Sequence, residues 1–159
     1  MPIQVISMNN LSEDSRKRLS DALEKALADS YALFLKTQNY HWNIVGPEFN
    51  DLHDMFQKQY EAAFEEIDEL AERIRQLGFK VEGTFSRFKD VSSIKDGNKD
   101  NTAMEMVKDL KESHEEIIST MREVAKIAME EKDFATVDFM SDTLQDHEKT
   151  LWMLNALLQ

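Results

Sequence analysis

The sequence predicts an all-α protein built as one bundle of four long helices with a long connection in the middle. Two observations support this prediction. Only four Gly and two Pro occur in 159 residues, whereas strong helix formers such as Ala, Leu, Glu and Lys are abundant. In addition, apolar residues recur every three or four positions over four segments of helical length. A chain of this length fits one domain, which we expect to span residues 1–159.

The limits of the four helices follow from the apolar pattern and from capping residues. Ser12 is a typical N-cap, Thr102 followed by Glu105 forms a capping box, and Gly78 suits the residue after a helix. The second helix has the clearest pattern, because its apolar residues are spaced by four, four, three, four, three, four and three positions. We expect helices at about 12–40, 49–77, 102–130 and 133–158.

A long crossover is expected between the second and third helices. Residues 78–101 mix Gly, Ser, Asp and Lys with a few aromatic residues, and a short helix near Phe85 to Val91 fits within them. Such a crossover can join two parallel helices. Four long helices with short, long and short connections form the topology of ferritin-like bundles, which host many functions, so the fold alone does not give the function.

Charge and composition limit the classes of function. The net charge of −12 comes from 31 Asp and Glu against 19 Lys and Arg, which disfavours nucleic acid as a direct partner and attracts cations. The absence of Cys excludes disulfides, thiolate metal sites and Cys nucleophiles. The segment "MPIQVISMNN" has no targeting pattern, and no stretch approaches the roughly 18 apolar residues of a membrane span. We therefore expect a soluble cytoplasmic protein without a membrane partner.

The four histidines do not form the usual interior di-iron pattern. That pattern places Glu three residues before His, but Gln, Asn, Lys and Leu occupy the corresponding positions here. His114 and His147 lie on apolar seams, and we expect them to be buried core histidines with satisfied hydrogen bonds. His41 and His53 instead flank a helix break at Gly46 and Pro47, which would let the two rings approach each other.

A helical wheel places further polar residues on the stripe that carries His53. With His53 at 0°, the positions of four polar residues lie at about 40° to 100°, beside the apolar seam near −60°. These residues are Gln57, Glu61, Asp68 and Glu72. The pair at 68 and 72 has the i, i+4 spacing that can hold a cation, although such an acidic pair is also common on a solvated face.

Distance separates the two halves of this stripe. His53 and Asp68 are about 22 Å apart along one helix, so one chain cannot bring both to one ion. An antiparallel two-fold pairing would set His53 against Asp68 and Glu72 of a second copy. Mixed imidazole and carboxylate ligands suit Fe(II), Zn(II) or Mn(II), and the geometry does not choose among them.

The stretch "QNYHWNIVGPEFNDLHDMFQKQY" followed by "EIDELAERIRQLG" resembles the Dps family of miniferritins, and the similarity extends to the closing "LWML". The resemblance implies a hollow shell of twelve subunits with ferroxidase centres at its two-fold interfaces. His41 and His53 of one chain and Asp68 and Glu72 of its partner would be metal ligands. Trp42 would lie beside the centre and absorb stray oxidising equivalents.

The activity that the resemblance implies is oxidation of Fe(II), preferably by hydrogen peroxide, with Fe(III) stored as a mineral inside the shell. This chemistry would protect against oxidative stress, and other divalent metals such as Zn(II) would also fit the site. Acidic residues of the third helix would line pores at the three-fold axes, although they also suit an ordinary solvated face. These residues are Asp109, Glu112, Glu115, Glu116 and Glu123.

Two departures from the family pattern qualify this expectation. Gln57 stands where the family usually has Asp or Glu, and Glu61 lies about 6 Å further along the helix axis, too far to replace it readily. The alternative is therefore a non-catalytic metal-binding or nucleoid-associated shell with impaired ferroxidase activity. Family members that bind DNA commonly use a basic terminal tail, whereas only residues 16–18 cluster Lys and Arg here, so we expect weak or no DNA binding.

Overall fold

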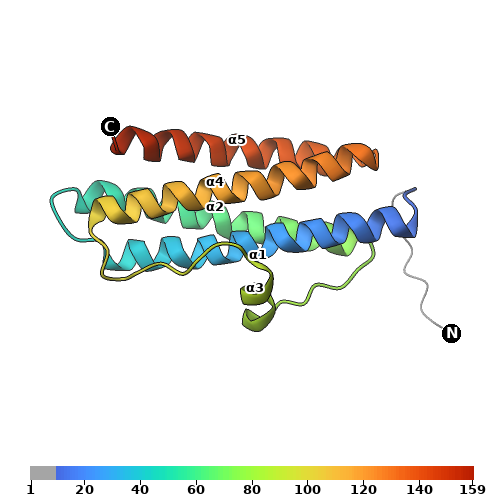
Figure 1. Cartoon of the computed structure of the whole chain (residues 1–159), viewed down its shortest axis with the longest axis horizontal. Helices are drawn as coiled ribbons and strands as arrows, with labels where there is room; N and C mark the ends of the chain where they lie inside the picture. The colour runs from blue at the N-terminus through green and yellow to red at the C-terminus, as the bar shows by residue number, and fades with distance from the viewer. Residues whose placement is uncertain (1–9) are drawn as a thin grey trace.

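A computed structural model describes residues 10–159, and the regular structure of this range is entirely helical. Residues 1–9, which make up most of the segment "MPIQVISMNN", lie outside the described residues. The four long helices lie side by side, and a short helix lies outside them (Figure 1). The helices are α1 (Glu13–Asn43), α2 (Phe49–Gln76), α3 (Phe85–Val91), α4 (Ala103–Glu130) and α5 (Phe134–Leu157).

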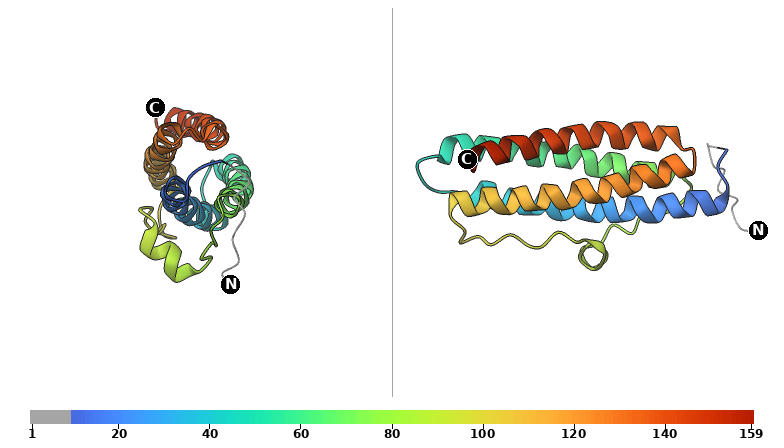
Figure 2. Two further views of the ribbon diagram at one scale, coloured as in Figure 1. Left: turned by 90° about the vertical axis from the view of Figure 1, so that its right-hand side faces the viewer. Right: turned by 45° about the horizontal axis from the view of Figure 1, so that its top comes forward.

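The connections give the predicted short, long, short order. α1 and α2 form one antiparallel hairpin, and α4 and α5 form another; α1 lies between α2 and α4 in the packing. The crossover runs along the outside of the bundle and carries α3 against α1, so α2 and α4 point in the same direction (Figure 2). α2 and α5 approach each other least of the neighbouring long helices. This confirms the predicted four-helix bundle.

The predicted capping residues stabilise the helix ends. The Ser12 hydroxyl accepts a hydrogen bond from the Ser15 amide at 3.1 Å. Thr102 and Glu105 form the complete capping box at the start of α4. Gly78 has a φ of +97°, which most other residues avoid, and it ends α2 as expected. These local signals place the helix starts close to where the sequence predicts them.

A continuous apolar core joins the long helices. Leu19, Leu23 and Leu27 of α1 are fully buried, and each such side chain stabilises the fold by about 1.5–3 kcal/mol. The ends of α2 and α5 are tied by a buried ion pair in which Arg73 donates two hydrogen bonds of 2.8 Å to Asp133. Burial opposes ionisation of Asp133, but hydrogen bonds from Thr136 and Arg73 outweigh it and lower its pKa.

No helix in residues 10–159 is both long enough and apolar enough to cross a bilayer.

Candidate metal centre

His41 and His53 come together at the end of the α1–α2 hairpin where the loop joins the two helices. The loop of residues 44–48 turns at Gly46, whose φ of +120° favours glycine. The two imidazole rings stack with their centroids 3.8 Å apart and their planes 17° from parallel. α1 continues to Asn43, three residues past its predicted end, so His41 lies inside the last turn of the helix. The helix break therefore brings the two rings into direct contact.

Reciprocal hydrogen bonds fix the orientation of both rings. His41 Nδ1 lies 2.9 Å from the carbonyl oxygen of His53, and His53 Nδ1 lies 2.8 Å from the carbonyl oxygen of His41. Because a carbonyl oxygen can only accept, each Nδ1 must carry the proton and donate it. In the neutral rings, each Nε2 is then left with a lone pair, which is the form that binds a metal ion. The backbone thus orients both rings with their Nε2 atoms able to accept a metal ion.

Aromatic contacts hold this pair in place. Phe49 stacks on His53 at 5.0 Å, and the Tyr60 ring meets His41 edge-on at 5.1 Å. Tyr60 in turn contacts Phe34, which contacts the largely exposed Phe64 of α2. We call this run of contacts from His53 to Phe64 the aromatic row. The row extends along α1 and α2 from the histidine pair to an exposed apolar side chain.

Asp68, Glu72 and Trp42 are exposed in the single chain. Fifteen residues of α2, about 22 Å of helix, separate Asp68 from His53. Among the described residues, no group of three or more His, Cys, Asp or Glu is arranged to hold a metal ion. One chain therefore brings the two predicted histidine ligands together, but it does not bring the two predicted carboxylates to them.

Gln57 lies on the same stripe of α2, one turn after His53. It is half-buried, and its amide nitrogen donates a hydrogen bond of 2.9 Å to Glu61 Oε1. With the nitrogen oriented toward Glu61, the carbonyl oxygen is the Gln57 atom left to face a ligand. A neutral amide oxygen supplies less negative charge to a metal ion than the carboxylate usual in the family.

The acidic residues of α4 differ in their availability. Asp109 accepts hydrogen bonds from Lys36, at 3.0 Å, and from Tyr40, so it is already paired within the chain. Burial and the neighbouring Asp109 raise the pKa of Tyr40 to about 12, which keeps its hydroxyl as a donor. Glu115 is paired with Lys111 at 2.8 Å. Asp109 therefore joins α1 to α4 through these contacts.

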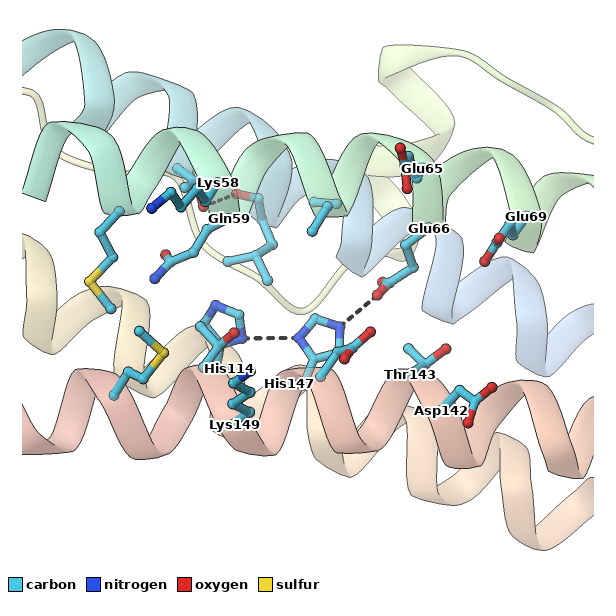
Figure 3. Close-up of a pocket in the computed structure, with 18 of the residues that line it drawn as sticks. Lys58, Gln59, Glu65, Glu66, Glu69, His114, Asp142, Thr143, His147 and Lys149 are labelled. Carbon is cyan, nitrogen blue, oxygen red and sulfur yellow. Dashed lines mark hydrogen bonds and ion pairs between the residues drawn. The ribbon is translucent and has the colours of Figure 1, made fainter.

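A second histidine pair lies inside the bundle. His114 Nδ1 and His147 Nδ1 are 3.0 Å apart, and His147 Nε2 lies 2.9 Å from Glu66 Oε2 (Figure 3). His114 Nε2 has no hydrogen-bond partner among residues 10–159, contrary to the expectation of satisfied hydrogen bonds. The apolar pattern places both histidines in the core, and both are buried. It does not identify Glu66, because this contact depends on how α2, α4 and α5 are rotated against one another.

Comparison with known proteins places this geometry in a family. The model of the ferritin-like domain matches residues 20–159, so the chain belongs to the ferritin-like proteins. Within them it belongs to the Dps miniferritins. The crystal structure of a Dps protein from Vibrio cholerae O1, described as a member of a broad superfamily of ferritin-like diiron-carboxylate proteins, matches with a TM-score of 0.92 and 32% identity; the match covers 97% of this chain and 98% of that one.

Sequence relatives support the same family. A DNA protection during starvation protein of Brevibacillus brevis is 32% identical over 137 residues, which are 86% of this chain and 92% of the relative. A low temperature-induced protein of Nostoc is 38% identical over 109 residues, 68% of this chain, and the match spans 61% of that relative's length.

Proposed function

We propose that this protein oxidises Fe(II) at centres shared between two subunits and stores the Fe(III) inside an oligomeric shell. Membership of the Dps miniferritins supports a role in iron storage and protection. The observation that carries the specific proposal is the His41–His53 pair, whose rings are locked with both Nε2 atoms available. Asp68 and Glu72 of a second subunit would complete the ligand set, with the Gln57 carbonyl oxygen as a weaker contact.

The residues present suit Fe(II) as a substrate. Imidazole nitrogens with carboxylate oxygens favour Fe(II) and Zn(II) over Mg(II) or Ca(II), and the carboxylates offset the charge that rises when Fe(II) becomes Fe(III). With hydrogen peroxide as oxidant, two Fe(II) ions each give one electron, the O–O bond breaks, and two protons complete two water molecules. Trp42, exposed next to His41, would take up an oxidising equivalent that escapes this reaction.

The shell we propose is a dodecamer, as the resemblance to the Dps family implies, and its two-fold interfaces would supply the second copy that the centre requires. The aromatic row ends at Phe64, which is 64% exposed, and Trp42 is 63% exposed near the histidine pair. Large apolar side chains exposed together on one surface are typical of an interface. Pairing this surface of α1 and α2 with its two-fold copy would bury both residues.

DNA binding is expected to be weak, and the named role of the Brevibacillus relative is not transferred to this chain. The basic residues 16–18 are engaged within the chain: Arg18 is paired with Glu130 and Glu131, Lys17 with Asp21, and Arg16 donates to the Leu77 carbonyl. The net charge of −12 per chain would repel phosphates. A cytoplasmic location remains an expectation.

The second candidate function is a metal-binding shell with impaired oxidation, and Gln57 favours it. The neutral amide of Gln57 weakens the part of the centre where the family usually supplies a carboxylate. Under this alternative the histidine pair binds iron but turnover is slow. Replacing Gln57→Glu restores the carboxylate and would raise the rate of oxidation about tenfold or more, the size of effect that changes near a metal commonly have.

The decisive experiment mixes anaerobic Fe(II) with the assembled protein, adds hydrogen peroxide and follows Fe(III) absorbance by stopped flow. We expect a fast phase that buffer lacks, and its loss in the Asp68→Ala/Glu72→Ala variant. Asp138→Ala/Asp142→Ala is the matched control, because it removes another exposed i, i+4 acidic pair. Oxidation no faster than in buffer would favour the non-catalytic shell, and a fast phase unchanged by the 68/72 variant would exclude those carboxylates.

A further inference from the structure

An open cavity of about 960 Å³ lies between α2 and α5, the two long helices that approach each other least. Residues from all four long helices line it, and His114 of α4 and His147 of α5 are among them. The cavity is separate from the stacked pair of His41 and His53, which does not line it. The two histidines that line this cavity therefore do not belong to the proposed ferroxidase centre.

Hydrogen bonds connect the inner histidines into a relay that we define as Ser30, Glu66, His147 and His114. The Ser30 hydroxyl donates to Glu66 Oε1 at 2.5 Å, and His147 Nε2 lies 2.9 Å from Glu66 Oε2. Because both Glu66 oxygens accept, His147 Nε2 carries a proton. In neutral His147, Nδ1 then has a lone pair and accepts a hydrogen bond from His114 Nδ1, at 3.0 Å.

The relay leaves one buried nitrogen with a lone pair. When His114 Nδ1 carries the proton, its Nε2 does not, and Nε2 has no hydrogen-bond partner among residues 10–159. His114 is only 4% exposed and lines the cavity. Burial and the neighbouring His147 lower the pKa of His114, which keeps the ring neutral. A buried imidazole in this state needs a cation or a hydrogen-bond donor.

Gln59 supplies a second atom with the same need. Its Oε1 is buried and likewise without a partner in the described part of the chain, and the residue lines the same cavity. Figure 3 shows the Gln59 side chain reaching from α2 toward the part of the cavity where His114 lies. A buried nitrogen and a buried oxygen, each without a partner in the described residues, therefore belong to two side chains that line the same cavity.

Charge distinguishes a cation from a neutral occupant. Seven Asp and Glu residues and two Lys residues line the cavity, a formal excess of five negative charges. Imidazole nitrogen with amide oxygen suits borderline divalent ions such as Zn(II), Co(II) and Fe(II), whereas Mg(II) and Ca(II) prefer oxygen alone. The carboxylate behind His147 increases the electron-donating power of the relay, as hydrogen-bonded carboxylates do for metal-binding histidines.

We propose that His114 Nε2 and Gln59 Oε1 bind a divalent transition-metal ion inside the bundle, at a site that one chain completes alone. Water fills the remaining coordination positions, so binding is weaker than at a site with four protein ligands. This site is independent of the proposed ferroxidase centre, since it needs neither a second subunit nor the stacked histidines. It predicts metal binding that survives when the outer pair is removed.

The test is an anaerobic Co(II) titration of the assembled His41→Ala/His53→Ala variant, followed by calorimetry and by the visible d–d absorption of the ion. We expect one bound Co(II) per chain, with an absorption change that reports a nitrogen ligand. Adding His114→Leu should remove this binding, and adding Gln59→Leu should weaken it about tenfold or more. Circular dichroism and size-exclusion chromatography check that each variant remains folded and assembled.

Two results would overturn the proposal. One is an absence of saturable Co(II) binding in the His41→Ala/His53→Ala variant, and the other is binding that neither His114→Leu nor Gln59→Leu changes. Gln59→Leu keeps the test valid if His114→Leu fails to fold, because Gln59 lies outside the relay. In crystals soaked with Zn(II), an anomalous peak beside His114 Nε2 supports the site, whereas a water molecule there without such a peak contradicts it.

Discussion

The bundle contains two histidine pairs that are built in opposite ways. In the outer pair, each Nδ1 donates to the other residue's backbone carbonyl, and both Nε2 atoms are left with lone pairs. In the inner pair, His114 Nδ1 donates a hydrogen bond to His147 Nδ1, and His147 Nε2 donates one to Glu66. Only His114 Nε2 is then left with a lone pair that has no partner among residues 10–159. One arrangement leaves two nitrogen lone pairs beside the α1–α2 loop, and the other connects three helices and leaves one.

The difference shows how the choice of hydrogen-bond partner determines what a histidine pair can do. A backbone carbonyl fixes the tautomer of its histidine without introducing a charge, so the outer rings are oriented by the α1–α2 hairpin alone. The inner pair depends on a carboxylate that is itself largely buried, and removing any member leaves a polar group without a partner. We therefore expect the outer pair to control iron chemistry and the inner pair to control stability.

The largest expected effect is on iron oxidation by the outer pair. Replacing His41→Ala and His53→Ala together should lower the rate of the fast phase about 100-fold or more, because both nitrogen ligands are lost. Stopped-flow absorbance of the assembled variant measures this rate. His114→Leu is the comparison at the inner pair and should retain the fast phase. A fast phase lost in His114→Leu but retained in the outer double variant would reverse the assignment of the two pairs.

The next effect is on stability and concerns the inner pair. His147→Ala should lower the free energy of unfolding by about 2–4 kcal/mol, since it leaves Glu66 and His114 buried without their shared partner. His53→Ala is the comparison and should cost less, about 1 kcal/mol, because His53 is only half-buried. Urea unfolding at one fixed subunit concentration measures both. Equal losses for the two variants would show that the inner relay has no special structural role.

The sequence predicts what depends on local signals. Ser12, Gly78 and the capping box at Thr102 mark helix ends through contacts within a few residues, so their patterns can be read directly. The approach of His41 to His53 also follows from a short loop with a glycine. α1 extends three residues beyond its predicted end, because no residue near position 40 stops a helix. The chain turns only at the loop that contains Gly46.

Contacts between distant residues explain what the sequence does not predict. Asp109 is one of the acidic residues predicted to line a pore, and that role stays a prediction; its pairing with Lys36 and Tyr40, across more than 60 residues of sequence, could not be predicted from spacing. The role of Glu66 likewise requires the rotation of three helices. Asp68 and Glu72 as ligands remain predictions, because they concern a second copy of the chain. Side-chain spacing thus identifies candidates, and packing decides which of them are already occupied.

The smallest expected effect is a dependence of stability on pH that comes from the inner pair. Burial lowers the pKa of His114 well below its usual value of about 6.5. Below pH 6.5, His114 therefore binds a proton in the unfolded chain but not in the folded chain. Folded stability is therefore highest above pH 6.5 and falls as the pH drops toward the lowered pKa, by at most about 1.4 kcal/mol per pH unit for this one group.

The window from pH 6.5 to about pH 5 isolates this contribution. Glu131 and Asp133 also have lowered pKa values in the folded protein, but carboxylates contribute a pH dependence mainly below about pH 4.5, where the unfolded chain begins to take up their protons. Urea unfolding at several pH values in this window, for the wild type and for His114→Leu, gives the slope of stability against pH. The variant should show a shallower slope. Subtracting its slope from that of the wild type removes the contribution of the other histidines. Identical slopes would mean that His114 takes up a proton as readily in the folded chain as in the unfolded one, and the lone pair assigned to its Nε2 would then be lost.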